Sequence, residues 1–297
     1  MIEYDSHDWI PNVFIWRGSM GKKLFLRITV ATAWAAIVTA LFVSEKAHGL
    51  SDRPHQLIGV ALGLLLVFRT NASYDRFWEG RRQWGNITNA SRNLARIVSV
   101  HCGADPSLAR EVLDWAAAFP YSAMHKLRGE QSLGDAAGWL GQPAVERVLA
   151  ESHVPLATLR RVTERLRAAR DAGHLSESAW LAADRHVSEL MDAIGACERI
   201  HSTPLPFGYV VHLRRAIMLY CGTLPFALVS EFRWWTIAVV LFVSFVMLGI
   251  EEIGVEIEDP FGKDDNDLPI EQLCQDIATT LRGLGAPRSP GEQGTEQ

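Results

Sequence analysis

Charged side chains follow an apolar segment without a break between Leu57 and Gly85. The stretch reads LIGVALGLLLVFRTNASYDRFWEGRRQWG, and its apolar part, Leu57 to Phe68, has only 12 residues. A helix needs about 20 residues to cross the roughly 30 Å hydrocarbon core of a membrane. The second half keeps a helical pattern while carrying Asp75 and Glu79. We therefore expect this helix to leave the hydrocarbon and to continue into water or into a polar bundle.

Three apolar side chains recur every four residues in this segment: Val60, Leu64 and Phe68. At 3.6 residues per turn they share one helix face, which drifts by about 40° per step. Gly59 and Gly63 lie on the neighbouring face, where small residues let membrane helices pack closely. Two interpretations stay open for the column: an ordinary core stripe, or an apolar constriction that lines a pore and gates it by excluding water.

Other residue types give no sign of catalysis or of a cofactor. The ten histidines are scattered, and no HExxH, GxSxG or phosphate-binding loop motif occurs, so the sequence does not predict an enzyme. The net charge of −5 gives no indication of a nucleic-acid partner. The four cysteines show no metal-ligand spacing, so we expect reduced, buried thiols and no metal site. They are Cys102, Cys197, Cys221 and Cys274.

Four apolar segments would position these residues. Leu24–Ser44, interrupted only by Arg27, and Trp234–Ile250 have the composition of ordinary membrane spans. The short segment from Leu57 and a third one, Leu205–Ser230, do not. The third carries His212, Arg214 and Arg215, and charges at such positions favour a bundle interior or a water-filled path over lipid contact. The alternative is a soluble all-α protein with buried helices.

Basic residues predict the orientation in a membrane. They cluster at or before the start of the first span and after the second apolar segment, whereas the loop between these segments has few. By the positive-inside rule, both chain ends and the centre are cytoplasmic. The acidic, polar N-terminus does not resemble a signal peptide. The basic residues are Arg17, Lys22, Lys23 and Arg27 on one side, and Arg69, Arg76, Arg81, Arg82, Arg92 and Arg96 on the other, against Lys46 and Arg53 in the loop.

The centre of the chain, residues 86–204, has the pattern of amphipathic helices, and no alternating strand pattern of useful length occurs. Gly103 and Gly173 stand where helices should end. The tail, residues 286–297, has a disordered composition. The expected inner faces are Leu156, Leu159, Val162, Leu166 and Ala169 in one helix, and Leu181, Val187, Leu190 and Ile194 in the next.

Four sequence stretches together resemble the bestrophin family, in its bacterial branch. They are WRGS at Trp16–Ser19, FRTNASYDRFWEGRRQWG from Phe68, TPLPFGYVVHLRR at Thr203–Arg215, and GIEEIGVEIEDPFGKDDNDLP at Gly249–Pro269. They occur in order across nearly the whole chain.

The resemblance implies an all-α integral membrane protein that forms a homopentameric ion channel. Each subunit would have four membrane helices and a large cytosolic helical region around a central pore. The family's neck positions fall on Val60, Leu64 and Phe68. The expected division is 1–85 for the N-terminal segment and first two membrane helices, 86–204 for the cytosolic helices, 205–258 for the third and fourth membrane helices, 259–285 for a cytosolic segment, and 286–297 for the tail.

Animal bestrophins bind calcium through an acidic cluster after the last membrane helix. The matching stretch here runs from Asp259 to Asp267, with Lys263 at a position where the animal pattern has an acid. A nearby ammonium group opposes calcium, which wants six to eight oxygen ligands. We expect no strong calcium dependence, and we expect Asp267 to cap the helix that starts near Pro269. Glu251, Glu252, Asp264 and Asp267 remain a candidate acidic cluster on the cytosolic side.

Selectivity is predicted from the family and from charge. Animal members pass anions, whereas the resemblance to the bacterial branch implies monovalent cations. The acidic end of the fourth segment agrees with cations such as sodium. Arg214 and Arg215 could attract anions, although pairing with Glu251 or Glu252 is the simpler interpretation. A chloride channel of the same architecture and a membrane scaffold without conductance stay open. The expected location is the bacterial inner membrane, with multiple passes, lipid contact and both termini cytoplasmic.

Overall fold

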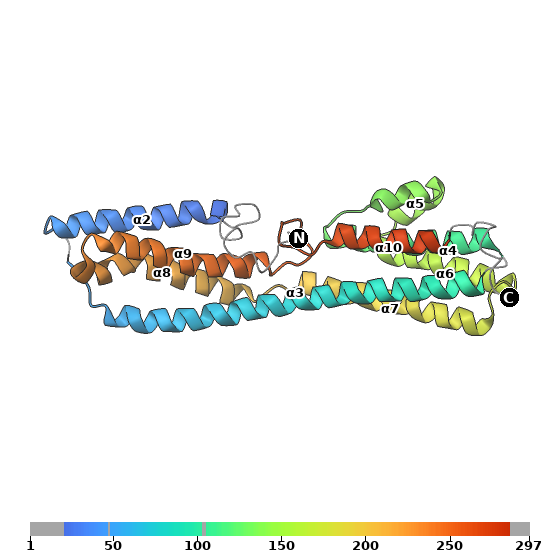
Figure 1. The fold of residues 1–297 in the computed structure, drawn as a ribbon, viewed down its shortest axis with the longest axis horizontal. Helices are drawn as coiled ribbons and strands as arrows, with labels where there is room; N and C mark the ends of the chain where they lie inside the picture. The colour runs from blue at the N-terminus through green and yellow to red at the C-terminus, as the bar shows by residue number, and fades with distance from the viewer. Residues whose placement is uncertain (1–20, 47, 103–104, 286–297) are drawn as a thin grey trace, which may run out of the picture. The chain divides into compact units, whose positions relative to one another are not determined.

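The computed structural model describes residues 21–46, 48–102 and 105–285, and the side chains from Leu24 onward. The WRGS motif, Gly103 and the tail 286–297 lie outside the described residues. Within the described ranges every regular element is a helix, so the prediction of an all-α protein is confirmed. Figure 1 labels the helices.

The helices are, in chain order, α2 Gly21–Val43, α3 Arg53–His101, α4 Pro106–Leu127, the short 3₁₀ helix η1 Gly134–Trp139, α5 Gln142–Leu149, α6 Val154–Asp171, α7 Glu177–Ser202, α8 Phe207–Phe232, α9 Trp235–Glu256 and α10 Ile270–Leu284.

The chain divides into two compact units. The first comprises residues 1–78 and 203–267, and the second comprises residues 79–202 and 268–297. The first unit contains α2, α8 and α9 together with the first half of α3. The second contains the rest of α3 with α4 to α7 and α10.

Three helices with described residues are long and apolar enough to cross a membrane: Leu24–Val43 in α2, α3 and α9. We expected ordinary span composition only at the first and last of these. The second segment qualifies as well by helix length and mean hydropathy, because its short apolar run lies within a much longer continuous helix. The fourth helix, α8, packs against α2 and α9 in the same unit.

Large apolar side chains form both the inside and the outside of this unit. Leu62 and Leu66 of α3 pack against Leu213 and Ile217 of α8 in a buried cluster. Phe25, Trp235 and Phe242 are among the large apolar residues that stay exposed. An apolar exterior of this kind suits lipid rather than water.

The long helix α3 continues through the charged stretch as predicted. Its 49 residues run from Arg53 to His101 without interruption, which corresponds to a length of about 74 Å at 1.5 Å per residue. Arg69, Asp75 and Glu79 are therefore interior helix positions, and the side chains that follow the apolar part have fixed directions around one axis.

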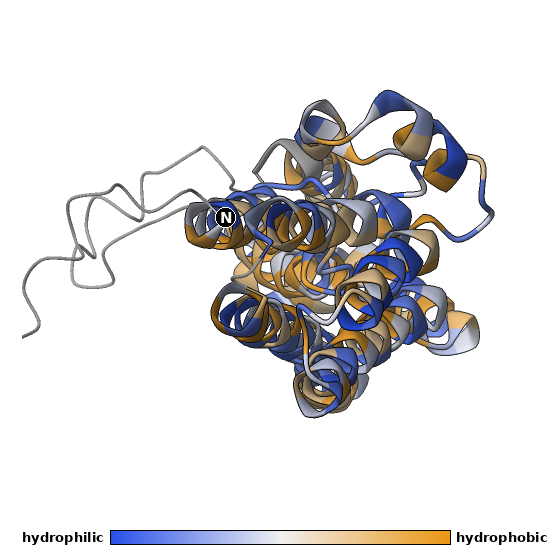
Figure 2. Ribbon diagram, turned by 90° about the vertical axis from the view of Figure 1, so that its right-hand side faces the viewer, coloured by the Kyte–Doolittle hydropathy of each residue, from blue (hydrophilic) through white to orange (hydrophobic). Residues whose placement is uncertain are grey.

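The second unit is built from amphipathic helices, several of which are coloured orange on one side and blue on another in Figure 2. Val162 and Leu166 of α6 are buried, as are Leu190 and Ile194 of α7. The positive φ of Gly173, +77°, follows the end of α6 as expected.

Two members of the predicted inner faces were assigned wrongly. Leu156 and Leu181 are 51% and 56% exposed. At about 100° per residue, each lies more than 100° around its helix from the far edge of the buried face, so including it made the predicted stripe too wide.

Candidate functional site

The apolar column on α3 points away from its own chain. Val60, Leu64 and Phe68 are 77%, 55% and 57% exposed in the single subunit, whereas Leu62 and Leu66 between them are almost fully buried. This alternation follows from the 100° step of the helix, which turns Leu62 and Leu66 towards α8 and turns the column outward. The column is thus not part of the core of one subunit.

The same exposed stripe continues beyond the apolar residues. Asn71 and Asp75 follow Phe68 by three and seven positions, which keeps all five stripe residues within about a quarter of the helix circumference. Both are exposed. Among the residues that the structure describes, none forms a hydrogen bond or an ion pair with the Asp75 carboxylate. Neither residue was predicted as a stripe member, although their spacing from Phe68 contains the signal.

The two glycines beside the column differ in their surroundings. A Cβ added to Gly59 would lie 2.8 Å from the Tyr220 hydroxyl oxygen, so the absence of a side chain permits this close approach of α8. A Cβ added to Gly63 would meet no atom within 4 Å. Gly63 therefore offers a flat, open surface in the single chain.

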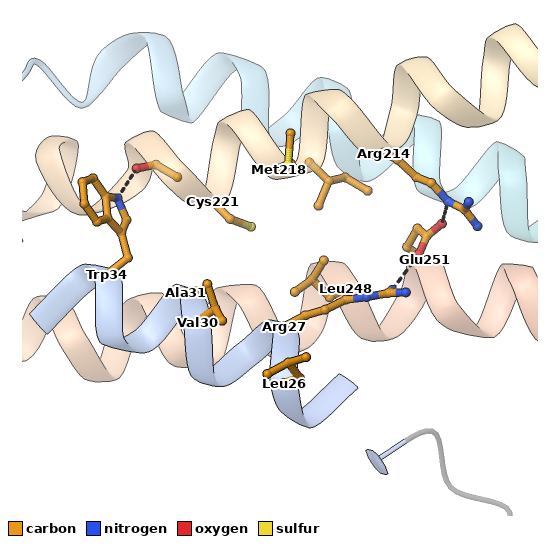
Figure 3. Close-up of a pocket in the computed structure, with 12 residues that line it drawn as sticks. Leu26, Arg27, Val30, Ala31, Trp34, Arg214, Met218, Cys221, Leu248 and Glu251 are labelled. Atoms are coloured by element: carbon orange, nitrogen blue, oxygen red, sulfur yellow. Dashed lines mark hydrogen bonds and ion pairs between the residues drawn. The ribbon is translucent and has the colours of Figure 1, made fainter. Parts of the chain in front are cut away.

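Glu251 and Glu252 are buried at the end of α9, where arginines from three helices reach them. Arg69 of α3 donates from Nη1 to Oε1 of Glu251 at 3.1 Å, and Arg214 of α8 donates from Nε to the same oxygen at 2.8 Å. Arg27 of α2 donates to Oε2 of Glu252 at 2.9 Å. The expected pairing of Arg214 with Glu251 is confirmed, and Figure 3 shows it. These acids are neutralised inside the unit rather than presented on its surface.

Asp264 and Asp267 belong to a different network, the turn after α9. Oδ2 of Asp267 accepts a hydrogen bond from the backbone N–H of Asp264 at 2.7 Å. Burial raises the pKa of Asp267 to about 6, and the charges of Asp264, Asp259 and Glu256 act in the same direction. The prediction that Asp267 caps the next helix is wrong. Pro269 is the N-cap residue of α10, and no side chain bonds that helix start.

Metal-ligating groups do not converge in the described part of the chain. No set of three His, Cys, Asp or Glu side chains among residues 21–46, 48–102 and 105–285 is arranged to hold a metal ion. All four cysteines are free and buried, as predicted. We therefore take the exposed stripe on α3 as the candidate functional site.

The sequence matches a known protein family and several named relatives over most of its length. The family model described as Bacterial/Fungal Bestrophin protein matches residues 1–283. A Synechocystis protein named voltage-dependent anion channel-forming protein sll1024 is 35% identical over 280 residues, covering 93% of this chain and 91% of that protein. Its Salmonella typhi counterpart YneE, of the same channel-forming description, is 30% identical over 302 residues and covers 99% of both chains.

Solved structures agree with the sequence comparisons. The crystal structure of a bacterial bestrophin homolog from Klebsiella pneumoniae superposes with a TM-score of 0.83 at 32% identity, covering 89% of this chain and 99% of that one. Together with the helical membrane unit described above, these matches show that the chain belongs to the bacterial and fungal bestrophin family of membrane ion channels.

Proposed function

We propose that this protein is a homopentameric channel in which Val60, Leu64 and Phe68 form the pore neck and through which monovalent cations such as sodium pass. The observation that carries the proposal is the exposed stripe on α3, which is apolar at these three positions and then becomes polar at Asn71 and Asp75.

A ring of apolar side chains from symmetry-related copies gives a narrow passage without charged groups that could hold an ion. Such a constriction resists wetting, and small changes in width or polarity switch it between conducting and closed. Gly59 and Gly63 lie beside the column and would let neighbouring helices approach closely.

Cation selectivity is supported by the distribution of charge around the stripe. Asp75 is an exposed carboxylate about two helical turns beyond Phe68, and a ring of these carboxylates would attract cations to one mouth of the neck. Glu251 and Glu252 contribute little to such a field because arginines neutralise them. The acidic cluster on the cytosolic side is thus reduced to the groups of the turn, Asp264 and Asp267.

An anion channel of the same architecture is the second candidate. The relatives above are named voltage-dependent anion channel-forming proteins. In addition, Arg215 is exposed, and the side chain of Arg214 is about half exposed despite its bond to Glu251. A scaffold without conductance would be the third outcome of the test.

The membrane placement that we propose is the bacterial inner membrane, with both termini in the cytoplasm. Residues 86–204 and 259–285 would lie on the cytoplasmic side, and the helices of 1–85 and 205–258 would contact lipid. The distribution of basic residues supports this orientation.

The decisive experiment is a measurement of the reversal potential of the purified protein in planar bilayers under a sodium chloride gradient. A value near the sodium equilibrium potential supports the proposal. A value near the chloride equilibrium potential supports the anion channel, and no discrete conductance at any voltage supports the scaffold. Subunit stoichiometry in detergent tests the pentamer separately.

A further inference from the structure

A cavity of about 630 Å³ opens between α2, α8 and α9 in the first unit, apart from the stripe on α3. Its walls are apolar and include Val30 and Trp34 of α2, Met218 of α8 and Leu248 of α9, as Figure 3 shows. The volume falls in the range of ~300–1,000 Å³ that is usual for small-molecule sites. The neck proposed above does not use this space.

One end of the cavity carries two arginines whose charges remain accessible. The side chains of Arg27 and Arg214 are 52% and 51% exposed, whereas those of Glu251 and Glu252 are only 3% and 6% exposed. Glu251 also lines the cavity, but both acids are almost fully covered, so the two guanidinium groups carry the accessible charge at this end. Each guanidinium has five N–H donors, and its hydrogen bond to a glutamate uses one of them.

The other end is set by Trp34. Its Nε1 donates to the carbonyl oxygen of Gly222 in α8 at 2.8 Å, which ties α2 to α8. Trp34 follows Arg27 by seven residues, so about 10 Å of helix separates the two levels. The cavity thus has a cationic end and an apolar remainder, and it lies in the unit that contains the membrane helices.

We propose that this cavity binds an anionic phospholipid, with its phosphate on Arg27 and Arg214 and part of one acyl chain along Val30, Trp34 and Met218. Guanidinium groups bind phosphate oxygens through paired, charge-assisted hydrogen bonds. A zwitterionic lipid would bring its ammonium group towards two guanidinium groups, so the site should prefer a lipid with net negative charge.

Native mass spectrometry tests the proposal on the full-length protein in detergent, with an equimolar mixture of dioleoyl phosphatidylglycerol and dioleoyl phosphatidylcholine. The wild type should retain phosphatidylglycerol in preference, at one molecule per subunit. Equal retention of the two lipids, or retention of neither, overturns the proposal. The second result would also arise if another copy of the chain filled the cavity.

The substitution Gly222→Phe fills the cavity and gives the sharpest variant. A Cβ added to Gly222, which lines the cavity, meets no atom within 4 Å, so a larger side chain can enter the space without a backbone clash. Gly249→Phe is the matched control, because a Cβ there also meets nothing and Gly249 does not line the cavity. Gly222→Phe should lose the bound lipid and Gly249→Phe should keep it, each with the wild-type oligomeric state. Retention of the lipid by Gly222→Phe contradicts the proposal.

Arg214→Gln tests the headgroup contact with little risk to folding, because Glu251 keeps its hydrogen bond from Arg69. The preference for phosphatidylglycerol should fall about tenfold, the change expected from the loss of one charge-assisted contact. An unchanged preference in a correctly assembled variant would remove Arg214 from the site. Because the readout is bound lipid rather than current, the outcome is independent of whether the neck conducts cations or anions.

Discussion

Arg69 directly follows Phe68 on α3, and the step of about 100° between them turns Phe68 outward and Arg69 into the core. Phe68 is 57% exposed, whereas Arg69 is fully buried and bonds Glu251 of α9 at 3.1 Å and lies 3.6 Å from Glu258. The side chain also passes Gly254, where an added Cβ would lie 3.1 Å from the Arg69 Nε. This buried ion pair fixes the rotation of α3 at the end of the apolar column, so it determines which face of the helix carries Phe68.

Arg69→Met should strongly destabilise the protein. Removing one partner of a buried ion pair typically costs about 3–5 kcal/mol, and the bond that Glu251 keeps from Arg214 should hold the cost near the lower end of that range. The midpoint of thermal unfolding in detergent should fall well below that of the wild type.

Arg82→Gln is the control for that variant. Arg82 and Glu79 form an exposed pair at 3.0 Å on the same helix, and exposed pairs contribute about 0–1 kcal/mol. Equal shifts of the unfolding midpoint for the two variants would show that Arg69 does not fix α3.

Leu64→Ala should widen the proposed neck. A ring of smaller side chains lowers the barrier to water and ions, so single-channel conductance should rise by roughly twofold or more. Ile58→Ala serves as control, because Ile58 is also exposed but lies about 120° around the helix from Leu64. If Ile58→Ala raised the conductance and Leu64→Ala did not, the pore would lie on another face of α3.

Asp75→Asn should shift the reversal potential towards that of chloride. Loss of an acidic ring removes a potential of a few kT at the mouth of the neck, so the ratio of sodium to chloride permeability should fall on the order of threefold to tenfold. Asp265→Asn makes the same change of charge at an exposed position outside α3. An identical shift for the two variants would indicate a general effect of net charge instead of a local one.

Asp267→Asn should remove a pH dependence of stability. The folded-state pKa of Asp267 is raised to about 6, mainly by burial, whereas an unfolded aspartate titrates near ~3.9. The folded protein therefore binds a proton that the unfolded chain has lost between these values. The stabilisation is fully present below the unfolded pKa and disappears as pH rises through 6, an effect of at most about 2–3 kcal/mol.

Thermal unfolding between pH 4 and pH 8 checks this prediction. The variant should have a flatter dependence than the wild type across the window from pH 4 to 6, and it should be at least as stable at pH 7. A wild-type slope in Asp267→Asn would assign the dependence to other groups.

Calcium should leave the conductance unchanged. In the turn that matches the animal calcium site, Oδ2 of Asp267 is occupied by the Asp264 N–H, and Lys263 adds a positive charge. Bilayer currents recorded with a calcium chelator and then with added calcium should agree. Steep activation by calcium would show that the turn rearranges into a site.

The sequence allowed the column and the continuity of α3 to be predicted because both depend on local periodicity. The four-residue spacing of Val60, Leu64 and Phe68 defines a face whatever the helix packs against. The direction of that face depends on packing partners distant in the chain. Arg69 and Glu251 are 182 positions apart, and no local pattern predicts which arginine reaches which glutamate.

The wrong assignments have related causes. The side chain of Asp267 bonds back to the Asp264 N–H within its turn, a choice that depends on how the chain folds between α9 and α10. Leu156 and Leu181 share an apolar character with the buried residues of α6 and α7, but only the position of neighbouring helices defines the width of a buried face. Local periodicity thus predicts helices and directions, whereas tertiary packing decides burial.

The burial of all four native cysteines has a practical consequence for experiments. Cys102, Cys197, Cys221 and Cys274 are each at most 6% exposed, and burial raises the pKa of Cys197 to about 12. Thiol reagents react with the thiolate form, so the native cysteines should react little with maleimides. A cysteine introduced at position 60, 64, 68, 71 or 75 could then be probed from either side of the bilayer without first replacing any of the four native cysteines.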